Sequence, residues 1–163
     1  MKAASVLGWF AAATITIAVA AEPSTPGQVA YPTGYRHWYH VKSMVIEAGH
    51  PLYEAFGGIH HLYANDKARA GYATGKFADG SVIAFDLLEA NHEGNAINEG
   101  ARKVLGVMQK DSHRFAATGG WGFEGFANGD HSKRVVGANA ATACFGCHTQ
   151  QKSKDFVFST LRE

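Results

Sequence analysis

The chain has 163 residues, of which 46% are hydrophobic, 12% aromatic and 18% charged. This length suits one domain, and the aromatic content excludes a disordered chain, which would have too little apolar surface to bury. The formal net charge is +1 with histidine neutral, so the basic field that nucleic-acid binding requires is missing. The 19 glycines predict many tight turns, which favours a β-rich fold.

The first twenty residues have the pattern of a secretory signal peptide. Lys2 precedes an almost wholly apolar run at residues 6–20, and Ala18-Val19-Ala20 offers the small-x-small pattern that signal peptidase cleaves. The run is short and rich in Ala and Thr, which disfavours a membrane span, although an uncleaved N-terminal anchor is the alternative. We expect residues 1–20 to be removed, residues 21–163 to form a single domain, and the mature protein to be periplasmic.

Aromatic and β-branched residues then recur in short runs separated by turn residues. A helix should begin after Asn65, which is a good N-cap, and end at Gly75. The sequence therefore predicts an α+β fold, predominantly an antiparallel β sheet with a few short helices, and a C-terminal helix after the last strand. The expected strands are residues 36–46, 59–64, 81–89, 103–110 and 121–126, and the expected loops are residues 51–58 and 91–102.

The strongest motif is C-x-x-C-H, formed by Cys144, Cys147 and His148. This spacing is typical of c-type haem attachment. Two thiols on a single helical turn can each add to one vinyl group of a haem, and the imidazole of the next residue can then reach the iron. We expect one covalent haem c per chain, held by Cys144 and Cys147, with His148 as an axial ligand to iron.

Other uses of paired cysteines fit less well. A thioredoxin-like redox motif would lie early in a βαβ unit, a structural zinc site would need a second ligand pair, and a plain disulfide would not need His148. Small electron-transfer cytochromes c carry the motif near the N-terminus and take a Met from downstream. Only 15 residues follow His148, and none is Met. A six-coordinate electron-transfer cytochrome c with an upstream His or Met ligand remains the alternative function.

The order of several segments resembles the cytochrome P-460 family, which includes the cytochromes c′-beta, over about residues 31–161. The resemblance implies a mainly antiparallel β fold, a homodimer and a five-coordinate haem whose distal side is open to a small ligand. We expect a periplasmic redox partner and no binding to nucleic acid. The segments are Tyr35-Arg36-His37-Trp38, residues 74–81, 110–115 and 120–124, and the C-x-x-C-H motif with residues 154–158.

Within that family, some members oxidise hydroxylamine and carry a lysine cross-linked to the porphyrin. Others lack the link and bind nitric oxide or carbon monoxide beneath an apolar aromatic lid. The resemblance would put the lysine just before the Thr-Gly turn, where this chain has Tyr72 and Ala73, while Lys67 and Lys76 lie nearby but out of pattern. We therefore expect no cross-link, and an open haem site that binds or converts nitric oxide or hydroxylamine.

Three charged or titratable side chains could serve this chemistry. Glu124 shares a strand face with Gly122 and Phe126 and could accept a proton from a substrate, or else simply face solvent. His60 and His61 are adjacent on a strand, so at most one of them can reach a haem pocket as a ligand or hydrogen-bond donor. The alternative for both is a structural role.

The remaining candidates would contact the haem rather than react. Arg36 could pair with a haem propionate, for which its planar guanidinium is suited, or form a surface ion pair. Phe56, Tyr72 and Phe85 are candidates for an aromatic distal pocket, with core packing as the alternative.

Overall fold

The computed structural model describes residues 27–162. The expected signal peptide at residues 1–20 lies outside this range. Within the described residues, no helix is both long and apolar enough to cross a membrane.

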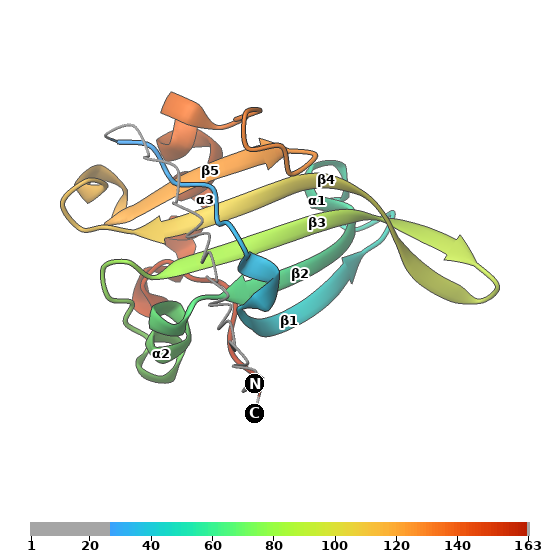
Figure 1. The fold of residues 1–163 in the computed structure, drawn as a ribbon, viewed down its shortest axis with the longest axis horizontal. Helices are drawn as coiled ribbons and strands as arrows, with labels where there is room; N and C mark the ends of the chain where they lie inside the picture. The colour runs from blue at the N-terminus through green and yellow to red at the C-terminus, as the bar shows by residue number, and fades with distance from the viewer. Residues whose placement is uncertain (1–26, 163) are drawn as a thin grey trace, which may run out of the picture.

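A five-stranded sheet dominates the structure, with each strand hydrogen-bonded to its sequence neighbours in the order β1-β2-β3-β4-β5 (Figure 1). All four pairings are antiparallel, and the few short helices pack around the sheet. The predicted α+β class is thus confirmed. The strands are β1 (Tyr39–Ile46), β2 (Gly58–Ala64), β3 (Val82–Glu93), β4 (Ala96–Lys110) and β5 (Trp121–Ala127).

The helices are short, and most occupy the connections. The helix α2 begins and ends as the sequence predicts, because the Asn65 side chain accepts a hydrogen bond from the amide of Ala68 and Gly75 adopts a φ of 69°. The α-helices are α1 (Tyr53–Phe56), α2 (Asp66–Thr74) and α3 (Gly146–His148), and the others are η1 (Tyr35–His37), η2 (Ala116–Thr118), η3 (Gly137–Asn139), η4 (Ala141–Phe145) and η5 (Thr149–Lys154).

The predicted loop at residues 91–102 is wrong, because β3 and β4 continue through it as a hairpin. Glu93 pairs with Ala96, and the two turn residues, Gly94 and Asn95, have φ angles of 57° and 61°, as a tight primed hairpin turn requires. Figure 1 shows this hairpin extending well beyond the other strands. Two smaller expectations also fail. The strand predicted from residue 36 begins only at Tyr39, and the loop predicted at 51–58 contains α1.

The two faces of the sheet carry separate apolar cores. Phe123 of β5 belongs to the first core, which also contacts Cys144 and Phe145 of the C-terminal segment. Phe126 belongs to the second, which includes Val29 of the N-terminal segment. Since side chains alternate across a strand, the haem-attachment motif is placed on one defined face of the sheet.

Candidate haem-binding site

The C-x-x-C-H motif lies on a continuous right-handed turn, in which the π-helical η4 runs directly into α3. Cys144 and Cys147 are not joined in a disulfide, and Cys144 is half-buried whereas Cys147 is exposed. Burial raises the pKa of the Cys144 thiol, and the charge of Glu124 adds to that effect. Within residues 27–162, no group of three or more His, Cys, Asp or Glu side chains is arranged to hold a metal ion.

His148 has one ring nitrogen engaged in a hydrogen bond and the other not engaged within the described chain. Its Nδ1–H donates a hydrogen bond to the carbonyl oxygen of Phe156 at 2.7 Å. The lone pair therefore resides on Nε2, which makes no hydrogen bond within the described chain. Burial lowers the pKa of His148, which favours the neutral form that binds metals. The rings of Phe123 and Phe158 flank the imidazole, with centroids at 4.9 Å and 5.1 Å.

Beside His148, the same face of the sheet offers an apolar surface, on which the side chains of Val135 and Phe85 lie next to Gly125 and Gly106. Phe85 is paired with Gly106, which is paired in turn with Gly125, so two of three neighbouring positions carry no Cβ. Further along, Met108 is half-buried and packs against the first core. An apolar surface of this kind suits the hydrophobic faces of a porphyrin ring. The donor set and the surface next to it thus fit a haem.

Three of the predicted pocket residues lie together. The ring of Phe85 contacts Phe56 at 5.9 Å and His60 at 4.7 Å between centroids. His60 is 2% exposed, its Nε2–H donates to the carbonyl of Phe56 at 2.5 Å, and its Nδ1 is buried without a partner. Tyr72 is not part of this group, since it packs against Phe77 and its hydroxyl lies 2.7 Å from that of Ser159.

His61 points to the opposite face, as adjacency on a strand predicts. Its Nδ1 lies 2.6 Å from the hydroxyl of Ser43, and its Nε2 lies 2.7 Å from a carboxylate oxygen of Glu99. These contacts fit the structural role that the sequence left open for it.

Arg36 forms the ion pair that was the alternative to a propionate contact. Its guanidinium lies 3.0 Å from Asp86, whose side chain is fully buried. The same carboxylate accepts hydrogen bonds from Tyr35 and Arg102. Burial alone would raise the pKa of Asp86, but these hydrogen bonds outweigh it and hold that pKa below its usual value. A contact between Arg36 and a propionate stays a prediction.

Glu124 is buried rather than solvent-facing. Its Oε1 accepts hydrogen bonds from the amides of Gly125 and Val136, both at 2.9 Å, and its Oε2 lies 3.2 Å from Arg134. Burial alone would raise the pKa of Glu124, yet these hydrogen bonds lower it overall. Because the preceding residue, Phe123, contacts His148, Glu124 projects from the other face of β5. A catalytic role for Glu124 stays a prediction.

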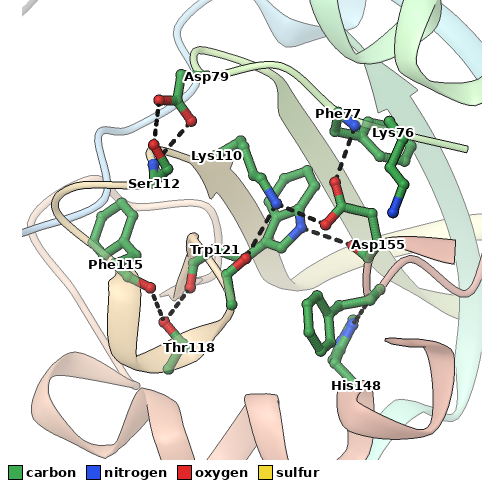
Figure 2. A network of polar contacts seen from close by, with 12 residues as sticks. Lys76, Phe77, Asp79, Lys110, Ser112, Phe115, Thr118, Trp121, His148 and Asp155 are labelled. Atoms are coloured by element: carbon green, nitrogen blue, oxygen red, sulfur yellow. Dashed lines mark hydrogen bonds and ion pairs between the residues drawn. The ribbon is translucent and has the colours of Figure 1, made fainter. Parts of the chain in front are cut away.

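The sequence assigned no role to a polar network behind His148. Figure 2 shows Lys110, Trp121 and Asp155 linked to one another above the imidazole. The only signal in the sequence was position, since Asp155 follows the haem motif by seven residues within a segment that carries the family resemblance.

A comparison with family models identifies the relatives of this chain. The model for Cytochrome P460 matches residues 32–159, which include all five strands and the C-x-x-C-H motif. A search of curated proteins gave no match. Since the matched region spans most of the sequence, the chain belongs to the cytochrome P460 family, whose cofactor is a haem.

Proposed function

We propose that this protein is a periplasmic mono-haem c-type cytochrome whose iron keeps an open distal position for nitric oxide, hydroxylamine or a similarly small ligand. The observation that carries the proposal is the state of His148. Its Nδ1–H donates to the Phe156 carbonyl, its Nε2 makes no hydrogen bond within the described chain, and it directly follows the second of two cysteines that are not joined in a disulfide. This is the arrangement that a proximal ligand needs.

In this proposal, Cys144 and Cys147 hold the haem through thioether bonds to its two vinyl groups. When bound, the haem supplies an iron that coordinates a small ligand and exchanges electrons with it. His148 would supply a nitrogen ligand to the iron, and Phe123 and Phe158 would support its ring from the positions that they already occupy. Covalent attachment would prevent loss of the cofactor outside the cytoplasm.

The group formed by Phe56, His60 and Phe85 supports an open rather than a filled distal position. The Nε2–H of His60 is already bonded to the Phe56 carbonyl, so binding iron through this nitrogen would break a buried hydrogen bond. Phe56 and Phe85 together form an apolar pair beside the haem surface. We assign this pair to the distal pocket, where a neutral diatomic loses little hydration on entry and an anion loses much.

The location and the assembly belong to the same proposal. Export by residues 1–20 would place the chain in the periplasm, where it would meet a redox partner. The homodimer follows from the family resemblance, and the edge strand β1 exposes Met44 and Val45 to a potential neighbour. Intact mass of native protein under denaturing conditions tests the export, and light scattering of the native protein tests the dimer.

Optical spectra of the purified protein test the central claim. We expect high-spin bands in the ferric and ferrous forms, which move when nitric oxide is added. The variant His148→Ala should lose the five-coordinate histidine spectrum, and the control His61→Ala, on the other face of the sheet, should keep it. Low-spin bands in both oxidation states that nitric oxide leaves unchanged would instead establish the six-coordinate electron carrier. Consumption of hydroxylamine in the presence of an electron acceptor would then distinguish an enzyme from a binding protein.

A further inference from the structure

We propose that Lys110 and Asp155 form a buried ion pair whose role is to position the Phe156 carbonyl, and through it the orientation and donor strength of His148. The inference rests on the proposed function, because it takes His148 as the iron ligand. Lys110 and Asp155 are positioning residues in this scheme and make no contact with a ligand on the iron.

The backbone around Phe156 has an unusual conformation. Asp155 and Phe156 have φ angles of 51° and 66°, although neither is a glycine. Two consecutive left-handed residues with side chains are unfavourable, so surrounding contacts must hold them. This reversal follows the end of η5, and it leaves the carbonyl of Phe156 within hydrogen-bond distance of His148.

Asp155 supplies those contacts, since it bonds to three separate parts of the fold. Its Oδ1 lies 2.7 Å from Nζ of Lys110, and its Oδ2 accepts the amide of Phe77 at 3.0 Å. Its own carbonyl accepts the indole N–H of Trp121 at 2.8 Å. Figure 2 shows these bonds converging on Asp155 directly above His148.

Lys110 anchors the pair to the sheet. It is the last residue of β4, and the side chains of Lys110 and Asp155 are only 10% and 12% exposed. Its Nζ also donates to the carbonyl of Gly119 at 3.1 Å and lies 5.0 Å from the ring centroid of Trp121. Both charges are largely removed from water. Neutralising one of them would therefore leave the other buried without a partner, which is unfavourable.

The consequence reaches the iron through one hydrogen bond. An acceptor at Nδ1–H fixes the tautomer and ring angle of an iron-bound histidine and increases its basicity. If the Phe156 carbonyl moves away, the imidazole becomes a weaker donor. A weaker donor lowers the iron–histidine stretching frequency and favours the ferrous over the ferric state, which raises the reduction potential.

The test compares holoproteins by resonance Raman spectroscopy and redox titration. Asp155→Asn and Lys110→Met should each lower the iron–histidine frequency of the ferrous form and raise the reduction potential, and the double variant should do little more than either single one. Lys110→Arg keeps the positive charge and should therefore retain most of the iron–histidine frequency that Lys110→Met loses. The matched control is Asp130→Asn, which breaks the exposed pair of Asp130 and Lys133, and it should leave both readouts at parent values.

Loss of thermal stability with an unmoved frequency and potential would overturn the inference, because the pair would then be merely structural. If Asp155→Asn yields no mature holoprotein, Lys110→Met supplies the decisive frequency, because it removes both the charge and the donor to Asp155 and should still lower the iron–histidine frequency. A parent protein that shows no iron–histidine band at all would refute the proposed function instead, so the two failures are distinguishable.

Discussion

Replacement of Glu124 by Gln tests what this buried carboxylate does. The structure makes Glu124 an anchor for residues 134–137, which lead into the haem-attachment turn. In Glu124→Gln, one carboxylate oxygen becomes an amide N–H₂ group. The amide N–H₂ group cannot accept a hydrogen bond from Arg134, so two hydrogen-bond donors would then face each other.

The expected loss follows from the contacts. A hydrogen bond to a charged group contributes about 1.5–3 kcal/mol, and Gln keeps an oxygen for the three amide contacts at Oε1 while losing the bond from Arg134. We therefore expect the free energy of unfolding at pH 7 to fall by about 2–3 kcal/mol. For a domain of this size, that corresponds to a decrease in Tm of roughly 5–10 °C.

The pH dependence provides an internal check. The pKa of Glu124 is lower in the folded state than in the unfolded chain, so its stabilisation is complete above the unfolded value of about 4.3 and is lost as pH falls through the folded pKa. The difference between parent and Glu124→Gln should therefore shrink as pH falls below about 4. Urea denaturation at several pH values, followed by far-UV circular dichroism, measures this difference.

The exposed residue Glu93 supplies the control, since Glu93→Gln should change stability by less than about 0.5 kcal/mol. Equal stability of Glu124→Gln and parent at pH 7, or a difference that persists at low pH, would refute the role of Glu124 as an anchor for residues 134–137.

Ligand binding tests the expected catalytic role of Glu124 in the same samples. A glutamate facing the iron ligand would repel anions, so the variant would then bind cyanide more tightly with carbon monoxide affinity unchanged.

Three further predictions concern the haem and the N-terminus. Replacement of both Cys144 and Cys147 by Ala should yield no haem that resists acid-acetone extraction, and full retention of such haem would exclude thioether attachment. Peptide mapping should find haem on the peptide with both cysteines and not on peptides with Lys67 or Lys76, because Tyr72 and Ala73 stand where the family resemblance would put a cross-linked lysine. The intact mass of the native protein should correspond to a chain that begins at residue 21 or 22. A mass that retains Met1 would instead support an uncleaved N-terminal membrane anchor.

The sheet was predictable wherever one face of a strand is buried. Ile83, Ala84 and Leu87 are buried in β3, and such an apolar run is readable from sequence. The distal half of the β3–β4 hairpin is exposed along its length, so its pairing leaves no hydrophobic pattern to detect. Only the Gly94-Asn95 turn marks it, and a turn alone does not distinguish a hairpin from a loop.

The site divides in the same way. The haem motif is local, because thiols and imidazole must share one helical turn, and its residues could be identified from spacing alone. The support of His148 is not local, since Lys110 and Asp155 are 45 positions apart and meet only because β4 ends beside the C-terminal segment. The left-handed conformation of Phe156 leaves no trace in the sequence, where glycine would be the expected residue.

Gly119 offers a final test of how firmly Phe156 is held. Gly119 has a φ of 65°, and a Cβ there would lie 2.4 Å and 2.7 Å from two ring carbons of Phe156. Gly119→Ala should therefore cost about 1–2 kcal/mol for the left-handed backbone and about 1–3 kcal/mol more for the overpacked contact. Gly75→Ala is the matched control, because Gly75 has a φ of 69° but nothing within 4 Å of its Cβ position. Urea denaturation should show the larger loss for Gly119→Ala, and only that variant should shift the ferrous haem spectrum. Equal losses with unchanged spectra in both variants would mean that the Phe156 ring yields freely and does not constrain His148.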